Sequence, residues 1–455
     1  FPKYPTYKDS GVEWLGSVPE HWRVERLKHV ATAFPSNVDK KSYDDEAPVR
    51  LCNYTDVYYN DEIREDMDLM MATATAEQIE KFSLRAGDTI ITKDSETSDD
   101  IAISAYVPND LPGVVCGYHL SMVRPKSGGN GRFLKRFFDS QVAKAQAAVT
   151  ANGLTRVGLG QYAIDNLHIA VPPLEEQVGI GAFLDRETAK IDALVAEQEQ
   201  LITLLKEKRQ AVISHAVTKG LDPSVPMKDS GVEWLGEVPA HWQVCTLRRL
   251  IKRIEQGWSP ECEAQPADEN SWGVLKAGCV NRGVFNPEEN KTLPDSLDPL
   301  PEYEVHEGDI LMSRASGSPE LVGSTAFVYQ TRPRLMLSDK IFRIHLEAGQ
   351  NRSFFVWSMN AKHMREQIEQ ALSGGNGLAN NLPQSVLLSF VCAVPPEAEQ
   401  LAISCALDHE SAQIDQLTAE AVLSIELLRE RRAALISAAV TGQIDVRALG
   451  VAHAA

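Results

Sequence analysis

The sequence of 455 residues lacks most of the features that mark membrane, secreted or catalytic proteins. No stretch approaches the roughly 18 consecutive apolar residues of a membrane span. The seven cysteines are widely spaced without a CxxC pair, which predicts reduced thiols in the cytoplasm and no zinc site. A GxxxxGK[ST] phosphate loop, an HExxH motif and the Asn-Pro-Pro-aromatic tetrapeptide of amino-methyltransferases are absent. We therefore predict no catalytic residues and no bound metal.

The chain also lacks an overall positive charge. Its 45 Lys and Arg residues face 63 Asp and Glu residues, a net charge of −18. Binding to phosphates needs a basic surface, so this balance argues against nucleic acid for the chain as a whole. Two segments, 124–156 and 332–365, each contain seven Lys or Arg residues among few acidic ones. The charge is therefore distributed in patches.

An internal repeat is the strongest feature of the sequence. The string KDSGVEWLG occurs at 8–16 and again at 228–236. Weaker matches follow in the same order: GDTIITKDS with GDILMSRAS, then VPP with VPP, then LLKEKRQAVISHAVT with LLRERRAALISAAVT. The chain thus consists of two units of about 220 residues whose ends are similar and whose middles diverge. Such a duplication favours two related modules that read different targets.

Each unit is predicted to be a globular α+β part followed by a long helix. Short apolar runs bounded by Gly, Pro, Asn and Asp are typical of strands, and 133–149 and 353–372 favour helix. The division that we predict is a first globular domain at 1–173, a long helix at 174–219, a second globular domain at 220–396 and a second long helix at 397–445.

A seven-residue apolar step indicates that the two long helices pack lengthwise as a coiled coil. At about 1.5 Å per residue, 43 helical residues make a rod of roughly 64 Å, which needs a partner of equal length. We expect the two helices to pair antiparallel around a pseudo-two-fold axis and to separate the globular domains. The predicted seam contains Leu184, Ile191, Leu194, Leu201, Leu205 and Val212 in the first helix and Leu407, Ile414, Leu417, Leu428 and Leu435 in the second.

The recurrence of a basic segment and a polar loop in both units favours a surface that faces DNA phosphates and bases. A solvated helix face and a plain surface loop are the alternatives for any single residue. The candidate DNA-binding residues are Lys93, Ser95, Arg124, Lys126, Arg132, Lys135, Arg136 and Arg156 in the first unit and Arg314, Ser316, Arg332, Arg334, Lys340 and Arg343 in the second. His21 and His241 recur beside tryptophan, which favours a structural role.

Three sets of motifs occur in both units: the opening segments YKDSGVEWLGSVPEHW and MKDSGVEWLGEVPAHW, the VPP…EQ starts of the long helices, and the helix ends EKRQAVISHAVT and ERRAALISAAVT. Together these motifs resemble the specificity subunit of Type I restriction–modification systems. The resemblance covers essentially the whole chain. It implies a non-catalytic subunit with two target-recognition domains, each reading one half of a split, asymmetric DNA site. It also implies docking to two modification (methyltransferase) subunits and, in the full complex, to two restriction (translocase) subunits.

By the same resemblance, S-adenosylmethionine, ATP and Mg²⁺ are expected in the partner subunits and not in this chain. Two other functions remain open on the residues alone. One is a self-sufficient DNA enzyme, against which the missing motifs speak. The other is a scaffold of two ligand-binding modules on a coiled coil, without DNA specificity.

Overall fold

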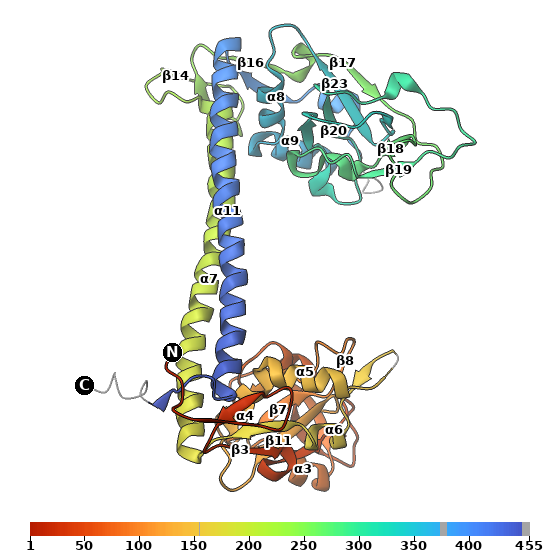
Figure 1. Ribbon diagram of the computed structural model, residues 1–455. Helices are drawn as coiled ribbons and strands as arrows, with labels where there is room; N and C mark the ends of the chain where they lie inside the picture. The colour runs from red at the N-terminus through yellow and green to blue at the C-terminus, as the bar shows by residue number, and fades with distance from the viewer. Residues whose placement is uncertain (154, 374–379, 448–455) are drawn as a thin grey trace. The chain divides into compact units, whose positions relative to one another are not determined.

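The computed structural model describes residues 1–153, 155–373 and 380–447 (Figure 1). The chain packs into two units, residues 1–199 with 422–455 and residues 200–421. The sequence-based division into four segments stays a prediction, since these units cut both long helices. Among the described residues, no helix is long and apolar enough to cross a membrane.

Unit 1 contains a four-stranded antiparallel sheet in the order β4-β11-β7-β9 and a three-stranded sheet in the order β10-β5-β6. The bounds are β4 Ala31–Pro35, β11 Leu120–Pro125, β7 Thr89–Thr92, β9 Ser104–Tyr106, β10 Val114–Cys116, β5 Ala47–Cys52 and β6 Met70–Ala74. Short pairs add β1 Tyr7–Asp9 with β2 Ser17–Pro19, β3 Arg23–Arg26 with β13 His168–Val171, and β8 Asp94–Ser95 with β12 Val157–Gly158. Strand β7 is buried along its whole length, as expected of the inner strand TIIT.

Helix α4 (Gly131–Asp139) packs on β7 and β9, and α5 (Gln141–Thr150) follows it. The single helical stretch predicted for 133–149 is two helices because Ser140 is extended and caps α5, accepting a hydrogen bond from the Ala143 amide at 3.2 Å. The other helices of this unit are α1 Leu27–Val30, α2 Tyr54–Tyr58, α3 Ala76–Phe82 and α6 Gln161–Asp165.

Unit 2 repeats this arrangement with changes in detail. Its four-stranded sheet has the order β17-β23-β20-β21 and its three-stranded sheet the order β19-β18-β22. The bounds are β17 Ile251–Gln256, β23 Ile341–Leu346, β20 Ile310–Ser313, β21 Thr325–Phe327, β19 Asn290–Thr292, β18 Gly273–Leu275 and β22 Leu335–Met336; the short pairs are β14 Met227–Asp229 with β15 Glu237–Pro239 and β16 Gln243–Thr246 with β24 Val391–Val394. The helices are α8 Arg352–Met359, α9 Lys362–Ser373 and α10 Gln384–Leu387.

The repeated opening segment is fastened to the start of each long helix by one glutamate. In unit 1 the fully buried Trp22 donates its indole N–H to the Glu176 carboxylate at 3.0 Å, and His21 Nε2 lies 2.7 Å from the same group. In unit 2, Glu399 holds Trp242 and His241 at 3.0 and 2.8 Å. A carboxylate that receives such donors fixes the segment in place. Both histidines thus have structural partners.

The long helices α7 (Leu174–Lys219) and α11 (Glu397–Val440) pair antiparallel within each unit. In unit 1, Arg432 contacts Asp192 at 2.9 Å and Arg429 contacts Glu199 at 3.3 Å, so residue numbers rise in one helix as they fall in the other. In unit 2, Arg209 contacts Asp415, and Ile213 and Val217 share a core with Ile403 and Leu407. The α+β class with long antiparallel helices is confirmed.

The seam between the long helices has two rows of side chains. One row repeats every seven residues from Leu184 and Leu407, and the second row differs from the prediction. Leu184, Ile191, Leu205, Leu407, Ile414 and Leu435 are buried, and Val212 and Leu428 are half-buried. Leu194, Leu201 and Leu417 are wrong as seam residues, being 44%, 39% and 47% exposed. The second row follows the first by four residues, at positions such as Thr188, Ile425 and Ala439, which are buried. The first row therefore occupies the d position of the heptad. A step of four from d leads to the a position in the seam, whereas a step of three leads to the g position at its edge.

Candidate nucleic-acid interface

The first polar cluster lies in unit 1 where β7 ends and β11 begins. Lys93 follows β7; its ammonium group donates to the Ser36 carbonyl at 2.9 Å and lies 4.7 Å from the centre of the exposed Tyr118 ring. The next residue, Asp94, has its carboxylate 2.9 Å from His119 Nδ1. A cation, a carboxylate, an imidazole and an aromatic ring are thus gathered at one edge of the sheet. These are groups that can contact phosphates and base edges.

Tyr54 of helix α2 adds a phenol beside Ser95 and within the electrostatic reach of Arg156. Burial, and the nearby Asp100, raise the pKa of Tyr54, so the hydroxyl stays protonated and can donate a hydrogen bond. On the neighbouring Tyr58, hydrogen bonding to the Asp100 carboxylate at 2.9 Å likewise raises the phenol pKa. The two tyrosine rings stack 5.4 Å apart, which orients the phenol edges.

The second cluster occupies the equivalent place in unit 2. Arg314 follows β20 and donates to the Asp339 backbone carbonyl at 3.1 Å, and the Lys340 ammonium lies 2.9 Å from the Asp339 carboxylate. Ser259 donates its hydroxyl to the same carboxylate at 2.5 Å. Burial tends to raise the pKa of Asp339, but Ser259 and Lys340 bring it below its ordinary value.

One backbone hydrogen bond shows that the two clusters correspond. The Lys93 amide donates to the His119 carbonyl at 3.0 Å, and the Arg314 amide donates to the Lys340 carbonyl at 2.8 Å. Both pairs of positions are 221 residues apart. The same scaffold therefore presents Lys93 and His119 in unit 1 but Arg314 and Lys340 in unit 2.

Several predicted DNA-binding cations are instead internal counter-ions. Lys135, Arg136 and Arg343 are buried, and Arg124 is half-buried. Arg124 makes two 2.7 Å contacts with the fully buried Asp88. Arg343 contacts Glu255 at 2.6 Å and Asp309 at 3.3 Å. Lys135 is 3% exposed. A buried cation needs a carboxylate partner, and that partner takes up the charge that DNA would use. The prediction is therefore wrong for Arg124, Lys135, Arg136 and Arg343.

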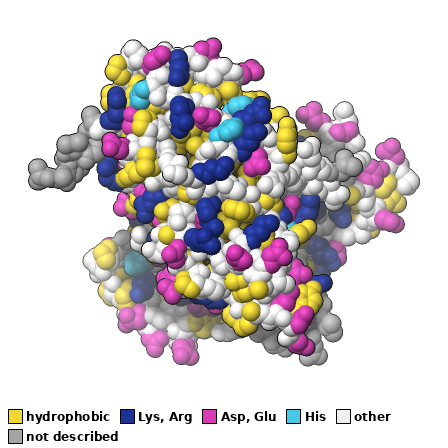
Figure 2. All heavy atoms as spheres, turned by 90° about the horizontal axis from the view of Figure 1, so that it is seen from below, with side chains coloured by type: hydrophobic (Ala, Val, Ile, Leu, Met, Phe, Trp, Pro, Cys, Tyr) yellow, Lys and Arg dark blue, Asp and Glu magenta, His cyan; other side chains and the backbone are white. Residues whose placement is uncertain are grey.

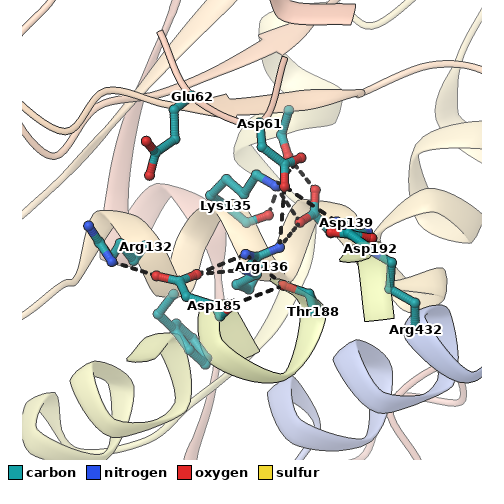
Figure 3. Close-up of polar contacts among 12 residues, drawn as sticks. Asp61, Glu62, Arg132, Lys135, Arg136, Asp139, Asp185, Thr188, Asp192 and Arg432 are labelled. Atoms are coloured by element: carbon teal, nitrogen blue, oxygen red, sulfur yellow. Dashed lines mark hydrogen bonds and ion pairs between the residues drawn. The ribbon is translucent and has the colours of Figure 1, made fainter. Parts of the chain in front are cut away.

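Figure 3 shows the network that holds two of these cations. The Lys135 ammonium lies 2.9 Å from Asp61 and 2.8 Å from Asp139. Arg136 reaches Asp139 at 3.1 Å and Asp185 of α7 at 2.8 Å (Figure 3). Partial desolvation of the exposed Asp61 carboxylate tends to raise its pKa, but the charges of Lys135, Arg432 and Arg136 bring the pKa below its usual range. We call this network the clasp, because it joins the loop at Asp61, helix α4 and the two long helices within unit 1.

The remaining predicted residues are distributed differently. Lys126, Arg132, Arg156, Arg334 and Lys340 are exposed, while Lys93, Arg314, Ser316 and Arg332 are half-buried. Arg132 belongs to the clasp through Asp185, at 2.5 Å. Arg332 donates to the Ser271 carbonyl and Arg334 to that of Asn270, which ties both to a neighbouring loop. Ser95 is buried, so its hydroxyl is a poor candidate for DNA contact and this assignment is corrected. The structure brings Lys93 and Arg156 to the first cluster and Arg314 and Lys340 to the second. The Ser316 amide donates instead to the Asn380 carbonyl at 3.2 Å.

Charge on the surface is mixed. On the face drawn in Figure 2, Lys and Arg side chains are scattered among acidic, apolar and uncharged ones. This distribution agrees with the net charge of −18. Any contact with phosphates on such a surface depends on local groups such as those of the clusters.

Sequence reasoning missed the aromatic and acidic members of the clusters. Tyr54, Tyr118, His119 and Ser259 lie outside the basic segments 124–156 and 332–365. Asp339 lies inside the second segment, as one of its few acidic residues. The offset of 221 residues that links Lys93 to Arg314 also links His119 to Lys340, so the repeat contained this signal. In the part of the chain that the structure describes, no group of three or more His, Cys, Asp or Glu residues could hold a metal ion.

Part of the chain matches a known protein family. A family described as the Type I restriction modification DNA specificity domain matches residues 19–204. This match, together with the similarity to specificity subunits of Type I restriction enzymes described below, supports the resemblance found in the sequence.

Individual relatives agree with this assignment. The specificity subunit of the Type I restriction enzyme EcoEI from Escherichia coli is 34% identical over 220 residues, which are 48% of this chain and 36% of that protein. The EcoKI specificity subunit from Escherichia coli strain K12 is 22% identical over 95% of this chain and 91% of its own length. One solved chain comes from work on the structural basis of complex assembly and conformational transition in the type I R-M system. It superposes on this chain with a TM-score of 0.70. That chain is 17% identical and the match covers 94% of this chain and 99% of that one, so the likeness shows the fold alone.

Proposed function

We propose that this chain is the DNA sequence-recognition subunit of a Type I restriction–modification complex and has no catalytic activity of its own. Each globular part reads one half of a bipartite, asymmetric site through its polar cluster. The long helices set the distance between the half-sites and dock two modification subunits. In the full complex two restriction subunits join them, and S-adenosylmethionine, ATP and Mg²⁺ belong to these partners.

One observation carries the proposal: the same backbone position presents different side chains in the two units. Lys93 with His119 and Arg314 with Lys340 offer different patterns of donors and acceptors on equivalent strand ends. Readers that differ in this way recognise different base edges, so two of them on one scaffold suit a non-palindromic site. The acidic remainder of the chain disfavours indiscriminate adhesion to DNA.

The test is co-expression of the chain with its methyltransferase subunit, followed by mapping of methylated sites in the host genome. We expect Lys93→Met to relax or weaken recognition of one half-site and Arg314→Met that of the other. Each loss should be about 1–3 kcal/mol if the side chain contacts a base. If the side chain contacts a phosphate, binding should weaken uniformly and the salt slope should fall by about one.

Lys190→Met is the matched control, because Lys190 is an exposed cation on α7 that pairs with Glu187 one helix turn away, at 2.9 Å. It should leave the methylated motif unchanged. If replacing residues 1–170 by those of another family member changed both halves of the motif, the assignment of one half to each unit would be wrong. Absence of sequence-specific DNA binding by the assembled complex would favour the alternative, a two-module scaffold.

A further inference from the structure

Two cysteines face each other across the short sheet of unit 2. Cys245 in β16 and Cys392 in β24 are directly opposite in the antiparallel register. Directly opposite residues project to the same face with Cα atoms roughly 4.5–5.5 Å apart, a range that a disulfide accepts. The Cys392 thiol already lies 3.7 Å from the Cys245 backbone carbonyl.

The two thiols differ in their access to solvent. Cys245 is half-buried, whereas Cys392 is 2% exposed and packs in the core of the unit. The hydrogen bond from the Cys392 thiol, with help from nearby Arg249, lowers the pKa of Cys245 to about 7. The same hydrogen bond, together with burial, raises the pKa of Cys392. An accessible thiolate beside a shielded thiol is the usual division between an attacking and a resolving cysteine.

The chain contains a second opposed pair that serves as a comparison. Cys52 in β5 and Cys116 in β10 are partners in a parallel register, and both are fully buried. Burial raises the pKa of both thiols. Both cysteine pairs are therefore direct neighbours across a sheet. They differ in that solvent can reach Cys245 but neither cysteine of the other pair.

The fold itself does not require cysteines at these positions. In unit 1 the equivalent strands β3 and β13 pair Glu25 with Ile169 at the corresponding step of the register. The contact between Cys245 and Cys392 is thus a property of the second unit alone.

We propose that Cys245 and Cys392 are a redox-sensitive pair that closes to a disulfide when the chain meets a small-molecule disulfide such as oxidised glutathione. The Cys245 thiolate attacks one sulfur of oxidised glutathione, and a glutathione thiolate leaves. The Cys392 thiol loses its proton and attacks the Cys245 sulfur, which expels a second glutathione thiolate. Two protein thiols are oxidised to one disulfide and one glutathione disulfide is reduced to two glutathione thiols. The protons that the two cysteines lose are taken up by the two glutathione thiolates, so no proton is released overall.

The new bond would join β16 to β24, the strand that leads into α11. It would close a loop from residue 245 to residue 392 and restrict separation of β16 from β24. Since antiparallel neighbours place Cβ atoms somewhat farther apart than a relaxed disulfide prefers, we expect a bond that reduced glutathione reverses readily.

The experiment exposes the full chain, carrying Cys405→Ser, to oxidised glutathione and maps tryptic peptides without reduction. Cys405 is exposed and would share the tryptic peptide 366–429 with Cys392, so its removal gives an unambiguous assignment. We expect a Cys245–Cys392 cross-link to form at least tenfold faster than a Cys52–Cys116 cross-link. Reduced glutathione should remove it.

Single variants separate the two steps. With Cys392→Ser, Cys245 should accumulate as a glutathione mixed disulfide, because no second thiol resolves it. With Cys245→Ser, Cys392 should stay unmodified, because it is shielded. The proposal is overturned if no Cys245–Cys392 cross-link forms in the folded chain, or if the two opposed pairs react at equal rates. Neither outcome bears on DNA recognition.

Discussion

The clasp of unit 1 allows a quantitative prediction for the substitution Lys135→Val. Valine is the residue at the equivalent position of unit 2, Val356, so the replacement is one that the scaffold accommodates. It removes an ammonium group that is 2.9 Å from Asp61 and 2.8 Å from Asp139. Breaking a buried ion pair by removing one partner costs about 3–5 kcal/mol.

The structure sets the expected value within that range. Asp139 keeps Arg136 at 3.1 Å, and the Asp61 side chain is 56% exposed, so water can hydrate it again. Both facts favour the lower end, about 3 kcal/mol, which corresponds to a factor of roughly 100–150 in an equilibrium constant. Amide hydrogen exchange in α4 (Gly131–Asp139) measures the opening of this region directly.

Lys190→Met is again the matched control, since an exposed pair within one helix contributes only about 0.3–0.5 kcal/mol. Exchange in α8 (Arg352–Met359) should be unchanged in both variants. An acceleration in α4 of less than about fivefold, equivalent to about 1 kcal/mol, would refute the view that Lys135 stabilises the clasp.

The clasp also has a pH dependence of known sign. The folded-state pKa of Asp61 is lowered, so its contribution to stability is present above the ordinary Asp pKa of about 3.9. That contribution is lost as the pH falls through the lowered value. Protection of α4 in the natural protein should therefore fall in acid below about pH 4, and Lys135→Val should show a smaller fall.

Two further predictions test the opening segment and the helices. Trp22→Phe removes the 3.0 Å hydrogen bond to Glu176 and should destabilise unit 1 by about 1–3 kcal/mol in denaturant titrations, whereas Trp14→Phe, at an exposed tryptophan, should not. Seven residues inserted in α7 within 190–210, with seven at the paired position of α11, add about 10.5 Å of helix, or roughly three base pairs of DNA. Mapping of methylated sites should show a changed spacing with unchanged half-sites; altered half-sites would contradict the role of the helices in setting the spacing.

The sequence predicted the fold better than the site. Strings such as KDSGVEWLG recur because they form the same local contacts twice, as Trp22 with Glu176 and Trp242 with Glu399 show. The heptad step identified α7 and α11 because burial along a helix repeats with the helical turn. The choice between a step of three and a step of four for the second row depends on how the partner helix approaches, which the spacing alone does not determine.

The basic segments led to wrong DNA-binding assignments for a physical reason. Lys135 and Arg136 lie on a helix whose sequence shows their charge but not the direction in which they point. Their partners Asp61 and Asp185 come from elements 74 and 49 residues away, so only the tertiary structure shows that these charges are neutralised. In a chain with 63 acidic residues, a cluster of cations is as well explained by internal carboxylates as by DNA.

The two units use the same helix positions with different chemistry. Asp185 of α7 receives Arg136, whereas the equivalent Asp408 of α11 receives the indole N–H of Trp357 at 2.9 Å. The carboxylate recurs on the helix, and the group that contacts it has changed in the globular part. We expect this pattern in a duplicated chain whose two globular domains pack on equivalent helix positions but recognise different targets. At this position both helices keep the carboxylate, and the globular parts can differ because either a charged or a neutral donor satisfies it.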